Sequence, residues 1–339
     1  MATGLLLINL GTPDSPSTPD VRKYLTEFLN DSRVIDIPAV PRFLLVNGII
    51  VPFRSSKSAK LYQHIWTEQG SPLLTHSLAL KTKIQEAMGD DYIVELGMRY
   101  QQPSLESALD RLRLQKVDKV IIFPLYPHYA SSSTGSCIDK AIAILRTWEV
   151  IPNMQIISKF YDDPGYLNAM TTVAKKYNLE EYDFFLFSYH GLPERHINKS
   201  SAHYGDGSCL QPNCCEKIGP HNAYCYRAAC YDTTKRLVKM LKIPEGKYTS
   251  SFQSRLDDKW LKPYSDKVVA EKGQEGIKKM LVFSPAFVAD CLETIYEIGV
   301  EYAEIFHQHG GEKIQLVESL NTHSSWVEAI KQRVLQCAG

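Results

Sequence analysis

The chain has 339 residues, 44% of them hydrophobic and 22% charged, which is typical of a soluble globular protein with two domains. Lys plus Arg and Asp plus Glu both number 38, so no basic surplus indicates a nucleic-acid-binding protein. No run reaches the roughly 18 apolar residues of a membrane span, and the apolar start lacks the basic residues of a signal peptide. We therefore expect a cytoplasmic protein with reduced thiols.

The first half alternates short apolar runs with helical patterns. Residues 4–10 predict a strand, which a loop rich in Gly, Pro and Asp separates from a helix beginning near residue 18. Further strands are expected at residues 92–98, 119–124 and 155–158, with helices at 104–115 and 138–148. Short apolar strands separated by helices indicate a parallel sheet covered on both faces.

The same scheme starts again in the second half, with strands expected at residues 183–188, 248–252, 280–284 and 315–318. The sequence therefore predicts an α/β protein of two Rossmann-like, doubly wound domains with parallel four-stranded sheets, at residues 1–160 and 161–339. A cysteine-rich insert at 206–231 and a C-terminal helix belong to the second. Neither half carries a glycine-rich nucleotide fingerprint or a P-loop, so no nucleotide is expected.

Ligands of such folds bind beyond the carboxyl ends of the strands. His190 follows the fifth strand, in the sequence SYHGLP. A neutral imidazole at this position is able to accept a proton or bind a metal. For a lone histidine, however, the pattern favours a structural role, with the ring bonded to a backbone carbonyl.

The seventh strand leads into a predicted helix with an acidic row. Its carboxylates recur at steps of three and four, which places them along one helix face: Asp290, Glu293, Glu297, Glu301 and Glu304. The row is either a solvated acidic face or a track for cations and protons. Glu293 is the glutamate nearest the strand end, so it is the best placed of the glutamates to meet a ligand.

Two segments of the first half offer ligand contacts. Arg99 and Tyr100 end a strand, where the guanidinium suits a carboxylate and the ring suits a flat ligand. Residues 41–53 are apolar, bounded by prolines and too short to span a bilayer. They are compatible with a buried helix, an apolar lip on a pocket, or a contact with a membrane surface.

Five of the eight cysteines lie within 22 residues of the insert: Cys209, Cys214, Cys215, Cys225 and Cys230. In a reducing compartment such a group indicates metal ligands rather than disulfides. Four thiolates suit tetrahedral zinc or an iron–sulfur cluster, and the spacing matches neither a paired zinc module nor a ferredoxin run. The residues alone leave zinc and a 2Fe–2S cluster open.

Seven segments in this order resemble the ferrochelatase family over nearly the whole chain: LLLINLGTPDSP, LYQHIWTEQGSPL, GMRY, PLYPHYASSSTGS, SYHGLPERH, TSSFQSRLDDKWLKPY and SPAFVADCLETIYEIGVEY. The version here looks most like the protoporphyrin enzymes of Gram-negative bacteria. The resemblance implies a lyase that inserts Fe²⁺ into protoporphyrin IX and forms protohaem, the last step of haem synthesis. It implies a porphyrin distorted in a cleft between the two domains.

The resemblance also implies roles for individual residues. His190 and Glu293 match the catalytic pair, as proton acceptor and metal-site residues. Asp290, Glu297 and Glu301 match a proton or metal path, while Arg99, Tyr100 and Tyr62 match the porphyrin pocket. Residues 41–53 match an apolar lip that touches the membrane, so association with the cytoplasmic face of a membrane is an option.

Two positions depart from the animal members of the family. Cys291 stands where those enzymes often have a histidine, and Ser131 where they have a cluster cysteine. The insert instead resembles a bacterial subgroup that holds 2Fe–2S internally, which favours the cluster over zinc, with at most four thiols as ligands and Cys230 the least expected. The alternatives are a coproporphyrin ferrochelatase, a chelatase for another tetrapyrrole, and a non-catalytic porphyrin- or haem-binding protein.

Overall fold

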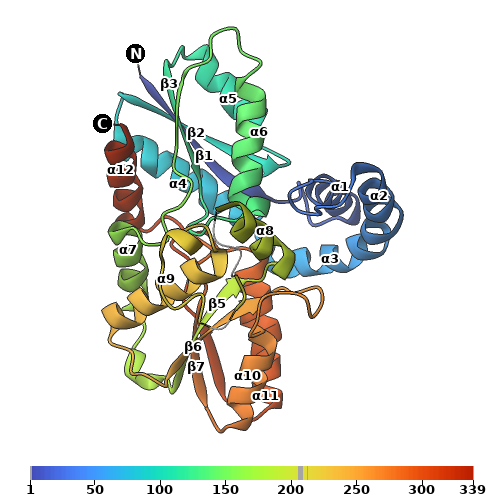
Figure 1. The fold of residues 1–339 in the computed structure, drawn as a ribbon, viewed down its shortest axis with the longest axis vertical. Coiled ribbons are helices and arrows are strands. Elements are labelled where there is room, and N and C mark those ends of the chain that lie inside the picture. Colours follow the sequence, from blue (N-terminus) through green and yellow to red (C-terminus); the bar gives the residue numbers. More distant parts are fainter. Residues whose placement is uncertain (1, 205–208, 212, 339) are drawn as a thin grey trace. The chain divides into compact units, whose positions relative to one another are not determined.

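The computed structural model describes residues 2–204, 209–211 and 213–338. The chain divides into two compact units, each built on a parallel sheet with helices (Figure 1). Unit 1 comprises Met1–Tyr126, Ala130–Lys159 and Trp326–Gly339, and unit 2 comprises Pro127–Tyr129 and Phe160–Ser325. The chain thus changes unit after residue 159, and residues 326–339 group with unit 1, whereas the sequence assigned the C-terminal helix to the second half.

The sheet of unit 1 has the strand order β2-β1-β3-β4. Its strands are β1 (Thr3–Gly11), β2 (Tyr92–Tyr100), β3 (Lys119–Pro124) and β4 (Asn153–Ile156). The flanking helices are α4 (Pro72–Met88), α5 (Leu105–Leu114), η2 (Ser131–Gly135), α6 (Ser136–Leu145) and α12 (Ser324–Ala338). Four consecutive side chains of β1, Leu5 to Ile8, are fully buried, because helices cover both faces of a parallel sheet.

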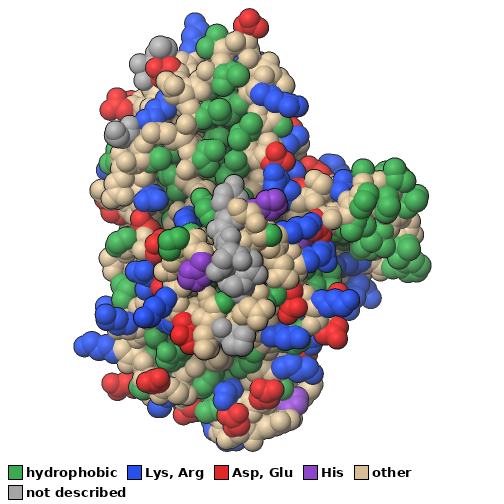
Figure 2. All heavy atoms as spheres, viewed as in Figure 1, with side chains coloured by type: hydrophobic (Ala, Val, Ile, Leu, Met, Phe, Trp, Pro, Cys, Tyr) green, Lys and Arg blue, Asp and Glu red, His purple; other side chains and the backbone are tan. Residues whose placement is uncertain are grey.

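Unit 1 also carries a helical lobe beside the sheet, formed by α1 (Thr18–Leu29), α2 (Ala39–Leu45), η1 (Val46–Ile50) and α3 (Val51–Ile65) (Figure 1). The apolar segment 41–53 is therefore helical, but it is not a buried helix. Val46 and Val51 are buried, but most of its other large apolar side chains face solvent, with exposed fractions of 61% for Phe43 and 82% for Phe53. Figure 2 shows hydrophobic side chains gathered over this lobe.

The sheet of unit 2 has the order β6-β5-β7-β8. Its strands are β5 (Phe184–His190), β6 (Tyr248–Gln253), β7 (Lys279–Phe283) and β8 (Lys313–Leu316). The helices are α7 (Pro164–Ala174), η3 (Leu179–Glu181), α8 (Glu194–Tyr204), η4 (Pro220–Asn222), α9 (Tyr226–Leu241), α10 (Ser265–Gln274), η5 (Glu293–Tyr302) and α11 (Ala303–Gln308). Residues 184–189 of β5 are buried. His190, the last residue of the strand, is half-buried at the carboxyl end of the sheet.

All eight strands expected from the sequence are present, and both sheets are parallel, so the predicted α/β fold class is confirmed. One helix differs in kind. The acidic segment was expected as an α-helix, but η5 is a ten-residue π-helix. Its backbone hydrogen bonds join residues five apart, whereas those of an α-helix join residues four apart. Within the described part of the chain, every helix is too short or too polar to cross a membrane.

Candidate active site

His190 lies where β5 leaves the sheet of unit 2. The strand is held on both sides by β6 and β7, so its last residue is fixed in position. The turn that follows depends on glycine, because a Cβ on Gly191 would lie 2.7 Å from the carbonyl oxygen of Gln253. The Gly191 amide donates to that same carbonyl at 2.8 Å, and the Tyr226 hydroxyl donates to the His190 carbonyl at 2.9 Å.

The imidazole of His190 has one engaged and one available nitrogen. Nδ1 lies 2.6 Å from the carbonyl oxygen of Gly191. A carbonyl only accepts, so Nδ1 carries the proton and the neutral ring keeps a lone pair on Nε2. Nε2 has no hydrogen-bond partner among the described residues. The carbonyl contact of a structural histidine is thus present, yet it leaves Nε2 able to accept a proton or bind a metal.

Glu297 is the most firmly held member of the acidic row. Its two carboxylate oxygens accept four hydrogen bonds: from Gln253 Nε2 at 3.1 Å, the Ser254 amide at 2.8 Å, Ser254 Oγ at 2.5 Å and Tyr302 Oη at 3.0 Å. Burial, followed by the charge of Glu297, raises the pKa of Tyr302, so the phenol remains a donor. With four donors on its two oxygens, this carboxylate is held in one orientation and is not free to rotate.

Gln253, which sequence reasoning did not single out, organises this part of unit 2. Its Nε2 also donates to the backbone carbonyl of Glu293 at 2.9 Å, and its Oε1 accepts from Ser188 Oγ at 2.7 Å. Ser188 and Ser251 both contact Ser265 Oγ, at 2.9 and 2.8 Å. This fully buried network ties β5, β6 and α10 to the start of η5. The only signal in the sequence is the run of small hydroxyl residues in a buried strand.

Asp290 and Glu301 lie apart from the two central glutamates of the row. Asp290 precedes η5, and its carboxylate accepts from Asn321 Nδ2 at 2.7 Å, the Ser319 amide at 3.2 Å and Thr294 Oγ1 at 3.2 Å. Glu301 is exposed near the end of η5. Of the five carboxylates, Asp290 thus precedes η5 and Glu304 follows it, and the predicted path through Asp290, Glu297 and Glu301 stays a prediction.

Glu293 is half-buried at the first position of η5 and lies beside a buried thiol. Cys291 occupies the position where animal relatives often have a histidine, and it is buried. Burial and then the negative charge of Glu293 raise the pKa of this thiol, so it stays neutral beside the carboxylate.

The porphyrin-pocket residues predicted in unit 1 form a closed polar group. Arg99 Nη2 pairs with Asp31 Oδ2 at 2.6 Å, and Arg99 Nε donates to Ser136 Oγ at 2.6 Å. The hydroxyls of Ser136 and Tyr100 also donate to Asp31. Burial acts to raise the pKa of Asp31, but these hydrogen bonds and the charge of Arg99 outweigh it and lower that pKa. The guanidinium is thus largely used within the unit, and Tyr100 is buried.

Tyr62, the third predicted pocket residue, lies on α3 inside an aromatic group. Its ring packs edge-on against Tyr24 and Trp66, with centroids 6.3 Å apart in both cases. Tyr24 stacks on Phe28, which contacts the ring of Tyr100 at 5.1 Å. Tyr62 is 8% exposed, so its main observed role is to hold the helical lobe to the end of β2.

Four of the five insert cysteines form one contact group. The Sγ atoms of Cys214 and Cys215 are 3.5 Å apart, and the thiols of Cys215 and Cys209 lie near enough to Cys225 to lower its pKa. Cys230 lies one turn into α9, where its buried thiol contacts the Tyr226 hydroxyl. We name Cys209, Cys214, Cys215 and Cys225 the thiol group.

Cys225 is the most acidic thiol of the group. It is the N-cap residue of α9, and the hydrogen bond from Cys215, then the amides of Ala228 and Arg227, lower its pKa to about 6. Burial is the main cause that raises the pKa of Cys209 to about 11. The donor chemistry fits a four-thiolate site, although no three described His, Cys, Asp or Glu side chains have the geometry of a formed metal site.

A second histidine escaped the sequence reasoning. His128 is buried in unit 2, stacked on Tyr161, with Nε2 2.9 Å from Thr233 Oγ1. Burial lowers its pKa to about 3, so the ring is neutral. It supports the ring of Tyr226, whose hydroxyl bonds the His190 carbonyl. His128 therefore acts through packing.

Comparison with known proteins places the chain in a family. The ferrochelatase family model matches residues 2–337. A ferrochelatase of Legionella pneumophila is 48% identical over 335 residues, covering 98% of this chain and 99% of the relative. One of Coxiella burnetii is 45% identical over 330 residues, covering 96% and 91%. The solved structure of SirB from Bacillus subtilis with Fe³⁺ covers 100% of this chain and 96% of its own, with a TM-score of 0.57 at 11% identity, a likeness of fold. The chain is therefore a metal-insertion enzyme of the lyase class that belongs to the ferrochelatase family.

Proposed function

We propose that this enzyme inserts Fe²⁺ into protoporphyrin IX, with His190 and Glu293 as the reacting side chains. The observation that supports these roles most directly is the fixed tautomer of His190, which leaves Nε2 as a free base at the end of a buried strand. Glu293 adds a half-buried carboxylate at the start of η5, a suitable oxygen ligand for Fe²⁺.

The reaction requires the removal of two protons. A free porphyrin carries two inner N–H groups, and both protons leave as Fe²⁺ enters, so the charge of the ring nitrogens balances that of the metal. Nε2 of His190 accepts one pyrrole proton, which makes the imidazole cationic with both nitrogens as donors. The imidazolium releases this proton to water, and the same Nε2 then accepts the second pyrrole proton. Bending of the porphyrin on binding exposes the nitrogen lone pairs, and Glu293 takes part in metal delivery.

The substrate is tested by anaerobic incubation of the purified enzyme with Fe²⁺ and, separately, protoporphyrin IX or coproporphyrin III. We expect rapid loss of free-porphyrin fluorescence and a haem spectrum with protoporphyrin. Turnover of coproporphyrin alone would assign the enzyme to the other substrate. Porphyrin binding without metalation of either would contradict the proposal and favour a binding protein.

We further propose that α2, η1 and the start of α3 contact a membrane. Val40, Phe43, Leu44, Ile49 and Phe53 are exposed on one small lobe, which is the property of a surface-seeking helix. The variant Phe43→Ser/Phe53→Ser should lose co-flotation with phospholipid vesicles. Leu114→Ser, at a 75% exposed side chain on α5, is the matched control. Equal flotation of both variants and the wild type would refute the contact.

We propose that the thiol group holds a 2Fe–2S cluster. Its four cysteines would be the ligands, and a bound cluster would supply a covalent cross-link of the insert and a one-electron redox centre. Cys230 is excluded from the proposed set because its thiol contacts the Tyr226 hydroxyl instead. Anaerobic purification should give two irons and two sulfides per chain, retained in Cys230→Ala and lost in Cys225→Ala. One zinc per chain and no sulfide would establish the zinc alternative.

A further inference from the structure

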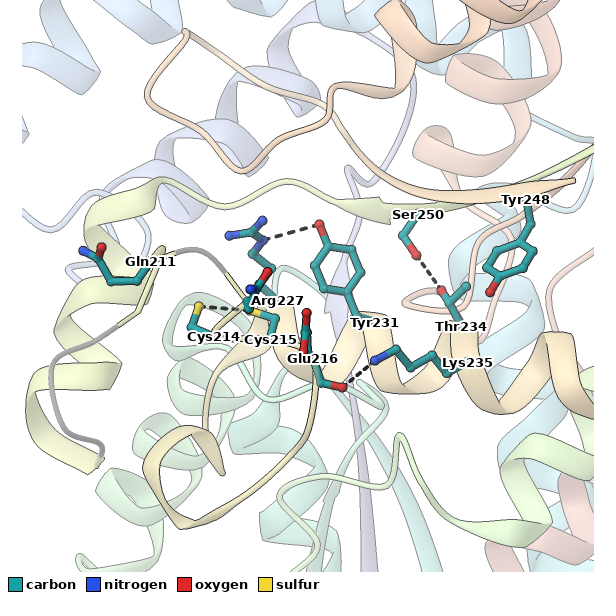
Figure 3. Close-up of a pocket in the computed structure, with 11 residues that line it drawn as sticks. Gln211, Cys214, Cys215, Glu216, Arg227, Tyr231, Thr234, Lys235, Tyr248 and Ser250 are labelled. Carbon is teal, nitrogen blue, oxygen red and sulfur yellow. Dashed lines mark hydrogen bonds between the residues drawn. The ribbon is translucent and has the colours of Figure 1, made fainter. Parts of the chain in front are cut away.

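A pocket of about 330 Å³ lies in unit 2, between the cysteine insert, α9 and β6 (Figure 3). Its volume is at the lower end of the roughly 300–1,000 Å³ typical of small-molecule sites. It does not involve His190, Glu293 or the other residues of the candidate active site. Its lining residues are Gln211, Asn213, Cys214, Cys215, Glu216, Arg227, Tyr231, Thr234, Lys235, Tyr248 and Ser250.

Two cations line the pocket, and neither forms an ion pair with a carboxylate among the described residues. Arg227 Nε donates to Tyr231 Oη at 3.4 Å, and its guanidinium lies 5.4 Å from the centre of that ring. Lys235 Nζ donates to the backbone carbonyl of Glu216, whose own side chain is exposed (Figure 3). A half-buried guanidinium without a carboxylate is unusual, because charges removed from water are normally paired.

The other residues that line the pocket are suited to an organic molecule rather than to an inorganic ion. The rings of Tyr231 and Tyr248 and the hydroxyls of Thr234 and Ser250 belong to α9 and β6 (Figure 3). Ser250 donates to Thr234 Oγ1 at 2.9 Å, which fixes both hydroxyls. Rigid aromatic surface beside a planar, fork-shaped cation is the usual recognition element for a small carboxylate.

We propose that this pocket binds a small organic carboxylate beside Cys214 and Cys215, with Arg227 and Lys235 as its charge partners. Two sources share this chemistry, a di- or tricarboxylic acid and a carboxylated thiol peptide. Arg227 and Lys235 both line this pocket from α9, so we expect one ligand with two or more carboxylates to lie between them. Ligand binding here is independent of iron insertion.

The test is isothermal titration calorimetry of the anaerobically purified enzyme with citrate, reduced glutathione and inorganic phosphate. We expect saturable binding of citrate or glutathione, and the one that binds identifies the source. Binding should weaken about tenfold or more in Arg227→Gln and in Lys235→Glu. Because Lys235 is exposed, Lys235→Glu should not disturb the thiol group. This variant therefore tests the pocket even if Arg227→Gln alters the thiol group.

Matched controls lie on the same helix outside the pocket. Arg236→Gln alters an arginine paired with Asp232, and Lys239→Glu alters an exposed lysine, and both should bind as the wild type does. Equal binding by Lys235→Glu and Lys239→Glu would overturn the location. Phosphate binding as tight as that of the carboxylates, or no binding of any probe, would overturn the ligand class. If no probe binds and only Arg227→Gln changes the absorption spectrum of the thiol group, the charge partners of Arg227 are the thiolates of that group and not a ligand.

Discussion

The two units share one sheet topology but treat the polar groups at their strand ends in opposite ways. At the end of β2 in unit 1, Arg99, Asp31, Tyr100 and Ser136 neutralise one another in a closed group. At the end of β5 in unit 2, hydrogen bonds hold the backbone and Nδ1 of His190 and leave Nε2 available. The comparison shows that the carboxyl end of a strand, at the edge strand β2 or at the inner strand β5, supports either stability or chemistry, depending on whether one polar atom is left without a partner.

The largest effect is expected from removal of that atom. His190→Ala should lower kcat by about 100-fold or more while porphyrin still binds, because the variant lacks the proposed general base. Metalation rate and porphyrin fluorescence quenching measure the two properties separately. His309→Ala is the control, since His309 also bonds a carbonyl through Nδ1 but lies at the end of α11. Equal rates for both variants would contradict the assignment.

A large effect on stability is expected at Glu297. Glu297→Ala should lower the free energy of unfolding by about 2 kcal/mol or more, because donors on Gln253, Ser254 and Tyr302 lose their acceptor. Chemical denaturation measures this change. Glu304→Ala, at an exposed site on α11, should be nearly neutral. If Glu297 were a mobile proton carrier instead, the variant would lose activity with unchanged stability.

A smaller effect is expected from the support of His190. Tyr226→Phe removes the hydrogen bond to the His190 carbonyl and should cost about 1 kcal/mol of stability. It should also shift the pH dependence of kcat, because the ring that it positions moves. Tyr189→Phe is a matched control, which loses a buried hydroxyl contact with Thr234 instead. A pH profile shifted equally by both variants would show a general loss of packing.

The smallest effect is a pH dependence in unit 1. The pKa of Asp31 is lowered on folding from an ordinary value of about 3.9, so its contribution to stability is complete above that value. The contribution is then lost as the pH falls from about 4 toward the folded-state pKa. Asp31→Asn should have a lower free energy of unfolding at pH 7 than the wild type. Below about pH 4, its free energy of unfolding should fall less steeply with decreasing pH. Asp139→Asn, at an exposed pair with Arg33, should keep it.

Much of the fold followed from local pattern. The inner strands β1, β3, β5 and β7 are short apolar runs between helices, because helices bury both of their faces. The edge strands β4 and β8 are less buried, and β6 is rich in hydroxyl residues, so the local signal is weaker there. The π-helix was not predictable, because Glu293, Glu297 and Glu301 have a spacing that also suits an α-helix. The contacts of Gln253 with η5 depend on residues about 40 positions away, which no local period reports.

The sequence by itself determined the fold class, the family, the position of His190 at the end of a strand and the presence of five cysteines within one insert. The tertiary structure decided which atoms remain available: Nε2 rather than Nδ1 of His190, little of the Arg99 guanidinium, and four thiols without Cys230. The physical reason is that residue type follows from the chain, whereas availability depends on partners that folding brings from distant positions. A hydrogen bond from one such partner is enough to turn a reactive group into a structural one.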